Sequence, residues 1–172
     1  MKSKFIIEPA LLDLDNPSAD IDAIRELNPQ RFEMEQLTSI LYEDLENRCC
    51  AGLKAVTDDE FWIRGHMPGM PLMPGVVMLE AVAQLSSFFT QKNDFLGAEM
   101  VGFGGVDDVR FRGVVTPGDN LVLMVQLLKA RRGRMIVAAF QGVVNEAIVV
   151  EGTLRGIPIP IEAVKSHLAQ RT

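Results

Sequence analysis

Apolar residues are most continuous between Val76 and Gln91, where they fall on nearly every side of a helix. This pattern predicts a buried helix of about 16 residues rather than a surface helix. Pro74 and Gly75 stand directly before it, where a proline favours helix initiation. The helix has one narrow polar stripe, because its polar residues recur at i, i+4, i+7 and i+11. These residues are Glu80, Gln84, Ser87 and Gln91.

After residue 93 the spacing changes to the alternation that is typical of β-strands. A hairpin with its turn at Arg132–Gly133 is predicted, followed by another strand after a turn near Asn145. The sequence TPGD (Thr116–Asp119) is a strong turn signal. Further strands are expected at Asn47–Val56, Val101–Val106 and Val109–Arg112.

The first part of the chain is less regular. Residues 1–20 are expected to form an irregular arm with a short strand at Phe5–Ile7. Ser18 or Asp20 can cap a short helix that presents Ile21, Ile24 and Leu27 on one face and ends before Pro29. The apolar pattern from Met34 to Tyr42 fits a strand or a helix equally well.

One long buried helix among antiparallel strands predicts an α+β fold, with the sheet wrapped around that helix. The length of 172 residues and the 48% hydrophobic content favour one domain with a substantial core. We place this domain at residues 21–157, between the arm (1–20) and a C-terminal tail or short helix (158–172).

The net charge of −6 argues against general nucleic-acid binding. Six basic residues nevertheless cluster between Arg110 and Arg134 with a single acid, Asp119. An acidic partner could dock there, but charge alone favours a solvated face and a charged hairpin turn.

No apolar run reaches the length of a membrane span, and the apolar run at the start of the chain is too short for a secretory signal. The cytoplasm is therefore the expected location. Cys49 and Cys50 are adjacent, so in a strand they point to opposite faces. We expect reduced thiols rather than a disulfide or a metal site, and no metal or cofactor is predicted.

Pro68, Pro71 and Pro74 recur at every third position between Gly65 and Gly75 and exclude a helix there. The resulting rigid loop carries His66, one of two histidines in the chain. A lone histidine is usually structural, but a stiff loop suits a positioned group. Imidazole is also the side chain best matched to taking a proton near neutral pH.

Glu80 is the only charged residue between Val76 and Thr90. A buried, unpaired carboxylate is costly and tends to bind a proton. Glu80 has two interpretations, which helix burial alone leaves about even. In the first, Glu80 is solvated or hydrogen-bonded to Gln84 one turn on; in the second, it is a carboxylic acid held ready to donate a proton.

The loop and the helix together contain the parts of an acid/base site. The N–H groups of Gly75 and Val76 lack intrahelical partners and can bind a carbonyl oxygen on which negative charge develops. With His66 as base and Glu80 as acid, these parts could remove a proton next to a carbonyl and expel a β-hydroxyl. The spacing permits this reaction without selecting it.

The segment GHMPGMPLMPGVVMLEAVAQ (65–84) resembles the signature of the hot-dog-fold 3-hydroxyacyl-acyl-carrier-protein dehydratases that carry Glu on the helix. Three further segments are similar to the same family: IDAIRELNPQRF (21–32), FGGVDDVRFRGVVTPGD (103–119) and KARRG (129–133). The resemblance covers most of the chain, from about residue 21 to about residue 155.

This resemblance implies a lyase of fatty acid biosynthesis that converts (3R)-3-hydroxyacyl thioesters on acyl carrier protein to trans-2-enoyl thioesters. It implies that His66 acts on the C2 proton, that Glu80 assists loss of the 3-hydroxyl as water, and that the N–H of Gly75 binds the thioester carbonyl. Val76 and Gln84 would support the site. Glu80 and Val76 stand where the isomerising sister enzymes have Asp and usually Cys, which favours dehydration alone.

The family also implies homodimers, which can assemble into hexamers, with His and Glu of each site on different subunits. The basic residues Arg110, Arg112, Arg131 and Arg132 would then face the acidic carrier protein, which reverses the preference stated above for a solvated face. Phe103 and Gly102 would line the acyl tunnel.

The sequence departs from the family pattern at several places. Gln30-Arg31 replaces the usual His-Arg, and Gly102 replaces a tyrosine that often gates the tunnel, which implies an open or differently shaped tunnel. Two alternatives stay open: a hot-dog acyl-thioester thioesterase, in which Glu80 activates water, and a non-catalytic acyl-thioester binder. The loop histidine favours dehydration over the first, and the presence of both His66 and Glu80 argues against the second.

Overall fold

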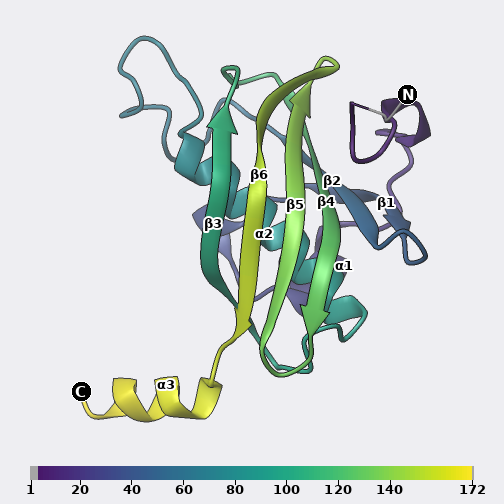
Figure 1. The fold of residues 1–172 in the computed structure, drawn as a ribbon. Coiled ribbons are helices and arrows are strands. Elements are labelled where there is room, and N and C mark those ends of the chain that lie inside the picture. Colours follow the sequence, from purple (N-terminus) through teal and green to yellow (C-terminus); the bar gives the residue numbers. More distant parts are fainter. Residues whose placement is uncertain (1–3, 172) are drawn as a thin grey trace.

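The computed structural model describes residues 4–171 and shows an antiparallel sheet curved around one long helix, α2 (Gly75–Lys92) (Figure 1). The α+β fold expected from the sequence is thus confirmed. The six strands are β1 (Ser39–Asp44), β2 (Cys49–Ala55), β3 (Val101–Phe111), β4 (Asn120–Arg131), β5 (Met135–Val144) and β6 (Ala147–Pro158).

The strand order in the sheet is β1-β2-β4-β5-β6-β3, and every neighbouring pair is antiparallel. The hairpin turns at Gly133 and Asn145 both have positive φ, as tight connections between antiparallel strands require, which confirms the two predicted turns. The TPGD turn is also confirmed, because Asp119 Oδ2 accepts hydrogen bonds from the backbone N–H and the hydroxyl of Thr116.

Helix α2 lies across the concave face of the sheet and supplies the centre of the core. Ten of its residues are buried, among them Leu85 and Phe88, which are at most 1% exposed. The predicted helix is therefore confirmed, with one further residue at each end. Its first turn is the exception to its burial, because the side chain of Val76 is 73% exposed.

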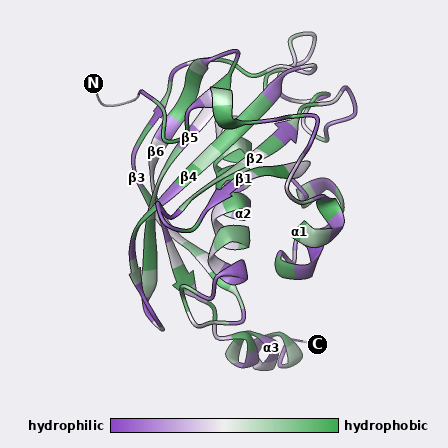
Figure 2. Ribbon diagram, turned by 90° about the vertical axis from the view of Figure 1, so that its right-hand side faces the viewer, coloured by the Kyte–Doolittle hydropathy of each residue, from purple (hydrophilic) through white to green (hydrophobic). Residues whose placement is uncertain are grey.

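The short helix α1 (Ile21–Leu27) lies on the same side of the sheet as α2 (Figure 2). Asp20 is its N-cap, since its carboxylate accepts a hydrogen bond from the N–H of Ala23 at 3.0 Å. Of the two caps considered, the structure thus uses Asp20. Ile24 is buried on the predicted apolar face, and the helix ends before Pro29. The ambiguous segment that follows becomes a 3₁₀ turn (Phe32–Met34) and then strand β1.

The N-terminal arm crosses the outer face of the sheet, opposite α2. The predicted strand at Phe5–Ile7 is wrong: this segment has no strand pairing, although Ile7 is 3% exposed. A side chain takes the place of a partner strand, because the Gln141 amide accepts a hydrogen bond from Ile6 N and donates one to Lys4 O. The arm therefore binds the sheet through side-chain contacts that local alternation does not reveal.

The two strands predicted at Val101–Val106 and Val109–Arg112 are one strand, β3, so their separation was wrong. Its register against β6 shifts between Phe103 and Gly105 and again between Asp107 and Arg110. These shifts are β-bulges, which absorb extra residues without ending a strand. Asp107 and Asp108 interrupt the apolar alternation, so the sequence pattern indicated two separate strands.

Cys49 and Cys50 are both free and buried on opposite faces of β2, as expected. Cys50 packs with α2, whereas Cys49 belongs to the outer cluster that the arm covers. Burial raises the pKa of the Cys49 thiol to about 11 and the pKa of Cys50 well above its usual value. Both thiols are therefore protonated at neutral pH.

The chain ends in a third helix, α3 (Ile161–Ala169), which lies outside the main body (Figure 1). Within residues 4–171, no helix combines the length and the apolar character needed to cross a membrane.

Candidate active site

His66 lies in the loop between β2 and α2 and is held at three points. Its backbone N–H donates to Trp62 O at 2.8 Å, and its carbonyl accepts from Leu72 N at 3.0 Å. Its ring Nδ1 lies 2.8 Å from Leu72 O. A carbonyl can only accept, so Nδ1 carries the proton and Nε2 of the neutral ring has a free lone pair. Nε2 is thus available as a base.

The loop is anchored to the body of the protein by buried contacts. Trp62, whose carbonyl binds the backbone N–H groups of Gly65 and His66, is 4% exposed. Lys54 of β2 forms an ion pair with Glu60 at 2.6 Å, with both side chains under a tenth exposed. These contacts fix the loop beside the start of α2.

The first turn of α2 presents backbone donors. Val77 and Met78 donate to Pro74 O, so the N–H groups of Gly75 and Val76 precede the first intrahelical bond. A Cβ on Gly75 would lie 2.6 Å from the Phe111 ring, which approaches the glycine backbone directly. The Phe111 ring therefore occupies the space beside Gly75 that a side chain would need.

Glu80 is half-buried on the next turn of α2. Its Oε1 accepts a hydrogen bond from Gln84 Nε2 at 2.8 Å. This is the first of the two interpretations of Glu80 given by the sequence, a hydrogen bond to Gln84 one turn on. The Gln84 amide also donates to Met34 O at 2.6 Å and accepts from Gln36 N at 2.9 Å. Gln84 is 2% exposed. Glu80 is consequently oriented by a buried amide that is itself held by the segment after α1.

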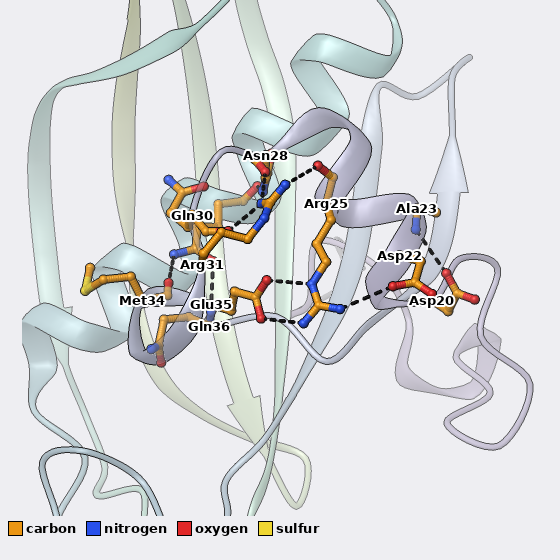
Figure 3. A network of polar contacts seen from close by, with 11 residues as sticks. Asp20, Asp22, Ala23, Arg25, Asn28, Gln30, Arg31, Met34, Glu35 and Gln36 are labelled. Atoms are coloured by element: carbon orange, nitrogen blue, oxygen red, sulfur yellow. Dashed lines mark hydrogen bonds and ion pairs between the residues drawn. The ribbon is translucent and has the colours of Figure 1, made fainter.

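Charged side chains hold that segment in place (Figure 3). Arg25 forms a bidentate pair with Glu35 at 2.6 and 2.8 Å and also binds Asp22 at 3.2 Å. Arg31 donates to three backbone carbonyls, those of Arg25, Asn28 and Gln30. The pKa of the Glu35 carboxyl lies below its usual value, mainly because Arg25 hydrogen-bonds to it.

Glu80 lines a cavity of about 60 Å³, together with Gln30, Ser87 and residues at the start of β3. Gly102 and Phe103, the predicted tunnel residues, both belong to this lining. Gln30 Oε1 is buried and has no hydrogen-bond partner within the described chain, so it can accept a bond from a ligand hydroxyl.

The space beside Gly102 is filled by another residue. A Cβ at Gly102 would lie 2.3 Å from Ile159 Cδ1. The small residue at the gate position therefore leaves no opening at this point, because a residue from beyond β6 occupies the space. Local sequence could not reveal Ile159, since it lies 57 positions from Gly102 in the chain.

His66 does not line the cavity that Glu80 borders. The lining of the Glu80 cavity comes from Gln30, α2, β3 and β6, with no residue from the His66 loop. The basic residues are also separated. Arg131, on β4, lies at the end of the sheet where β3 starts, whereas Arg110 lies near the other end of β3. Arg112 pairs with Glu151 at 2.5 Å, and Arg132 pairs with Asp94 at 2.6 Å.

No group of three or more His, Cys, Asp or Glu residues in the described part of the chain is arranged to hold a metal ion.

Comparison with known proteins identifies relatives over most of the chain. The profile of the FabA-like domain matches residues 28–153. The chain is 41% identical over 138 residues to the 3-hydroxyacyl-acyl-carrier-protein dehydratase FabZ of Desulfotalea psychrophila, which covers 78% of this chain and 90% of the relative. It is 34% identical over 152 residues to the FabZ of Hydrogenobaculum sp., which covers 85% and 99%.

Among solved structures, the dehydratase heterocomplex ApeI:P from Xenorhabdus doucetiae is similar with a TM-score of 0.67. The match covers 83% of this chain and 95% of that chain at 16% identity, which supports the fold alone.

Proposed function

The chain belongs to the FabA-like family of hot-dog dehydratases, and on that premise we propose that it uses His66 and Glu80 to dehydrate (3R)-3-hydroxyacyl-acyl-carrier-protein. The reaction is that of a hydro-lyase and yields the trans-2-enoyl thioester and water in fatty acid biosynthesis. The observation that carries the residue assignment is the His66 ring, whose Nδ1 is held by Leu72 O so that Nε2 can accept a proton.

The proposed step uses each group once. The N–H groups of Gly75 and Val76 bind the thioester oxygen, and His66 Nε2 takes the proton from C2. The electron pair forms the C2–C3 double bond as the C3–O bond breaks. Glu80 gives its proton to the departing hydroxyl, which leaves as water, and Gln30 Oε1 accepts a hydrogen bond from it. Proton exchange with solvent then restores neutral His66 and protonated Glu80.

The supporting residues orient the acid and enclose the acyl chain. Gln84 donates to Glu80 Oε1, which leaves Oε2 free for the substrate hydroxyl. Gly102 and Phe103 line the cavity beyond Glu80, where the acyl chain would lie. Val76 is the exposed residue after Gly75, and its N–H supplies the second donor.

We assign the complete site to two chains. Strand β3 is at the edge of the sheet, and none of its eleven residues is buried. Phe103 and Phe111 on it are each 51% exposed. An exposed edge strand presents unpaired backbone N–H and C=O groups that can pair with another chain. Antiparallel pairing of two β3 strands across a two-fold axis would bring the His66 loop of one copy toward the other copy.

The same pairing supports a docking surface for the carrier protein. Since the Arg110 end of β3 would lie beside the Val101 end of the partner's β3, Arg110 and Arg112 would lie at the same end of the paired sheet as Arg131 and Arg132 of the second copy. An acidic carrier protein is attracted by such a combined basic surface.

The proposal extends to a trimer of dimers and to a location in the cytoplasm. A reducing compartment suits the two free, buried thiols. The catalytic unit would be residues 21–157, with the arm (1–20) and the tail (158–172) outside it.

The direct test follows enoyl product and free thiol separately, with 3-hydroxyacyl carrier-protein substrates of several chain lengths. We expect enoyl product, and a fall in kcat of about 10²–10⁴-fold for both His66→Ala and Glu80→Gln. Gln91→Glu, at the far end of the polar stripe, is the control. Free thiol without enoyl product would instead identify a thioesterase, and full activity of His66→Ala would remove His66 from the mechanism.

Mixing the two inactive variants tests the two-chain site. A mixed dimer of His66→Ala and Glu80→Gln chains has one intact site, so a random mixture should recover about one quarter of the wild-type activity. Each variant alone stays inactive. No recovery in mixed dimers would place both residues of a site in one chain.

A further inference from the structure

A second cavity, of about 160 Å³, lies between the end of α1, the last turns of α2 and the start of β3. It adjoins the Glu80 cavity, because Ser87 and Val101 belong to the lining of both. Three members of the polar stripe of α2 border the two cavities in order: Glu80, Ser87 and Gln91. Ser87 is about 10 Å beyond Glu80 along the helix axis. An acyl chain that starts beside Glu80 and follows α2 therefore reaches the second cavity after Ser87.

The two cavities differ in character. The Glu80 cavity has an apolar side, formed by Ala83, Val101, Phe103 and Leu154. The lining of the second cavity instead contains four charged side chains and two amides, those of Arg25, Glu26, Arg31, Glu99, Asn28 and Gln91. Both cations already have partners, since Arg25 pairs with Glu35 and Arg31 donates to three backbone carbonyls (Figure 3). The second cavity is thus a polar space that water solvates better than a hydrocarbon chain does.

Asn28 is the least exposed polar residue of this lining, at 3%. Its Nδ2 donates to Gln84 O at 2.9 Å. Because a carbonyl can only accept, the orientation of the amide is fixed and Oδ1 is the atom left over. This oxygen is buried and has no hydrogen-bond partner within the described residues. A methylene chain packed against Asn28 would offer Oδ1 no donor and would exclude the water that could supply one.

From these contacts we infer that the polar second cavity restricts the substrate to 3-hydroxyacyl chains that end at or before Ser87, and that Asn28 sets this limit. The inference rests on the proposed dehydratase function and adds the class of acyl chain. Chains within the limit bury their methylene groups against the apolar side of the Glu80 cavity. Longer chains place further methylene groups against charged and amide groups, which cancels that gain.

Steady-state dehydration of a chain-length series tests the limit. Straight 3-hydroxyacyl chains on the carrier protein are lengthened by two carbons at a time, and kcat/KM is measured for each. We expect kcat/KM to rise by up to about fourfold for each added methylene group until the chain reaches Ser87, and then to level off or fall. A rise that continues through the longest chain would overturn the inference. No enoyl product at any length would instead overturn the proposed function.

A matched pair of variants tests the role of Asn28. This residue is the C-cap of α1, has an extended backbone and precedes Pro29, so β-branched side chains fit there. Asn28→Val and Asn28→Thr have nearly the same shape and both lose the bond to Gln84 O, but only the first removes the polar surface. We expect Asn28→Val to raise kcat/KM about tenfold for chains that pass Ser87, relative to shorter chains, and Asn28→Thr to keep the wild-type profile. The same change in both variants would contradict a limit set by polarity.

Binding to an inactive enzyme gives a measurement that needs no change in either cavity. His66 lines neither of them, so His66→Ala keeps both intact while it holds back the reaction. Dissociation constants for the same carrier-protein series should fall with chain length up to the chain that gives the highest kcat/KM, and no further. Affinity that keeps rising with longer chains would contradict the limit, whether or not the Asn28 variants fold.

Discussion

Among single residues, Gln84 connects the fold to the candidate chemistry. Its side chain forms hydrogen bonds with Glu80, Met34 and Gln36, between 2.6 and 2.9 Å long, and is 2% exposed. Removing one partner of a buried hydrogen bond leaves the others unsatisfied, which costs more than the bond itself contributes. Gln84 thus orients Glu80 and joins α2 to the segment after α1.

We expect Gln84→Leu to lower the free energy of unfolding by roughly 1–3 kcal/mol, because Met34 O and Gln36 N lose a buried partner. We also expect kcat to fall while KM changes little, since Glu80 loses its orientation. Urea unfolding and steady-state dehydration measure the two effects. Gln91→Leu, two turns further along the stripe and outside the lining of the Glu80 cavity, is the control. Unchanged kcat in a folded Gln84→Leu enzyme would separate Gln84 from the acid.

At the level of elements, the link between β2 and the His66 loop depends on one ion pair. Lys54–Glu60 is the only ion pair within residues 4–171 in which both side chains are under a tenth exposed. Burying two charges is costly, so the pair contributes to placement of the loop more than to net stability. Trp62 and His66 lie two and six residues after Glu60 in the same loop.

Lys54→Met is expected to lower the free energy of unfolding by about 3–5 kcal/mol, because Glu60 is left buried without a partner. The double variant Lys54→Met/Glu60→Leu should regain most of that stability. Its kcat should remain low if the pair positions the loop. Denaturant unfolding and kinetics on both variants check this; wild-type kcat in the double variant would limit the pair to a structural role.

The pair between α1 and the following segment predicts a pH dependence. Arg25 lowers the pKa of Glu35, so the folded chain favours the ionised carboxylate. The resulting stabilisation is complete above the unfolded pKa of Glu35 and is lost as the pH falls through the lower, folded value. Between about pH 5 and about pH 3, the melting temperature of the wild type should therefore fall more than that of Glu35→Gln. Glu26→Gln, exposed on α1, should follow the wild type. If the melting temperatures of all three proteins fell equally with pH, Glu35 would not contribute to the pH dependence of stability.

In the molecule as a whole, the sheet is covered on both faces by parts of the same chain. Helix α2 fills the concave face, and the arm covers an outer cluster that includes Leu53, Met124 and Val143. Ile7 inserts into this cluster, and Gln141 holds the adjacent backbone. The family profile begins at residue 28, so the arm lies outside the matched domain.

We expect Ile7→Ala to lower the free energy of unfolding by about 2 kcal/mol, the lower end of the range for a buried isoleucine, since an arm can detach without global unfolding. Leu11→Ala is the matched control, because Leu11 is 59% exposed in the same arm. Thermal unfolding compares the two. Equal, small effects would show that the arm adds nothing to the stability of the sheet.

The sequence alone determined the features that depend on near neighbours in the chain. Proline spacing excluded a helix before residue 75, periodicity placed α2 and its polar stripe, and turn residues located the hairpins. The contact between Glu80 and Gln84 could also be predicted, because residues four apart on a helix are neighbours. The resemblance supplied the family, which the comparisons confirm.

Only the tertiary structure decided the features that join distant segments. Ile159 closes the space at Gly102, the arm docks through Gln141, and β3 continues through its bulges because β6 lies beside it. It also separated Arg110 from Arg131, which are close in sequence but lie at opposite ends of the sheet. Local pattern reports the conformation of a segment, whereas these contacts depend on which surfaces the fold brings together.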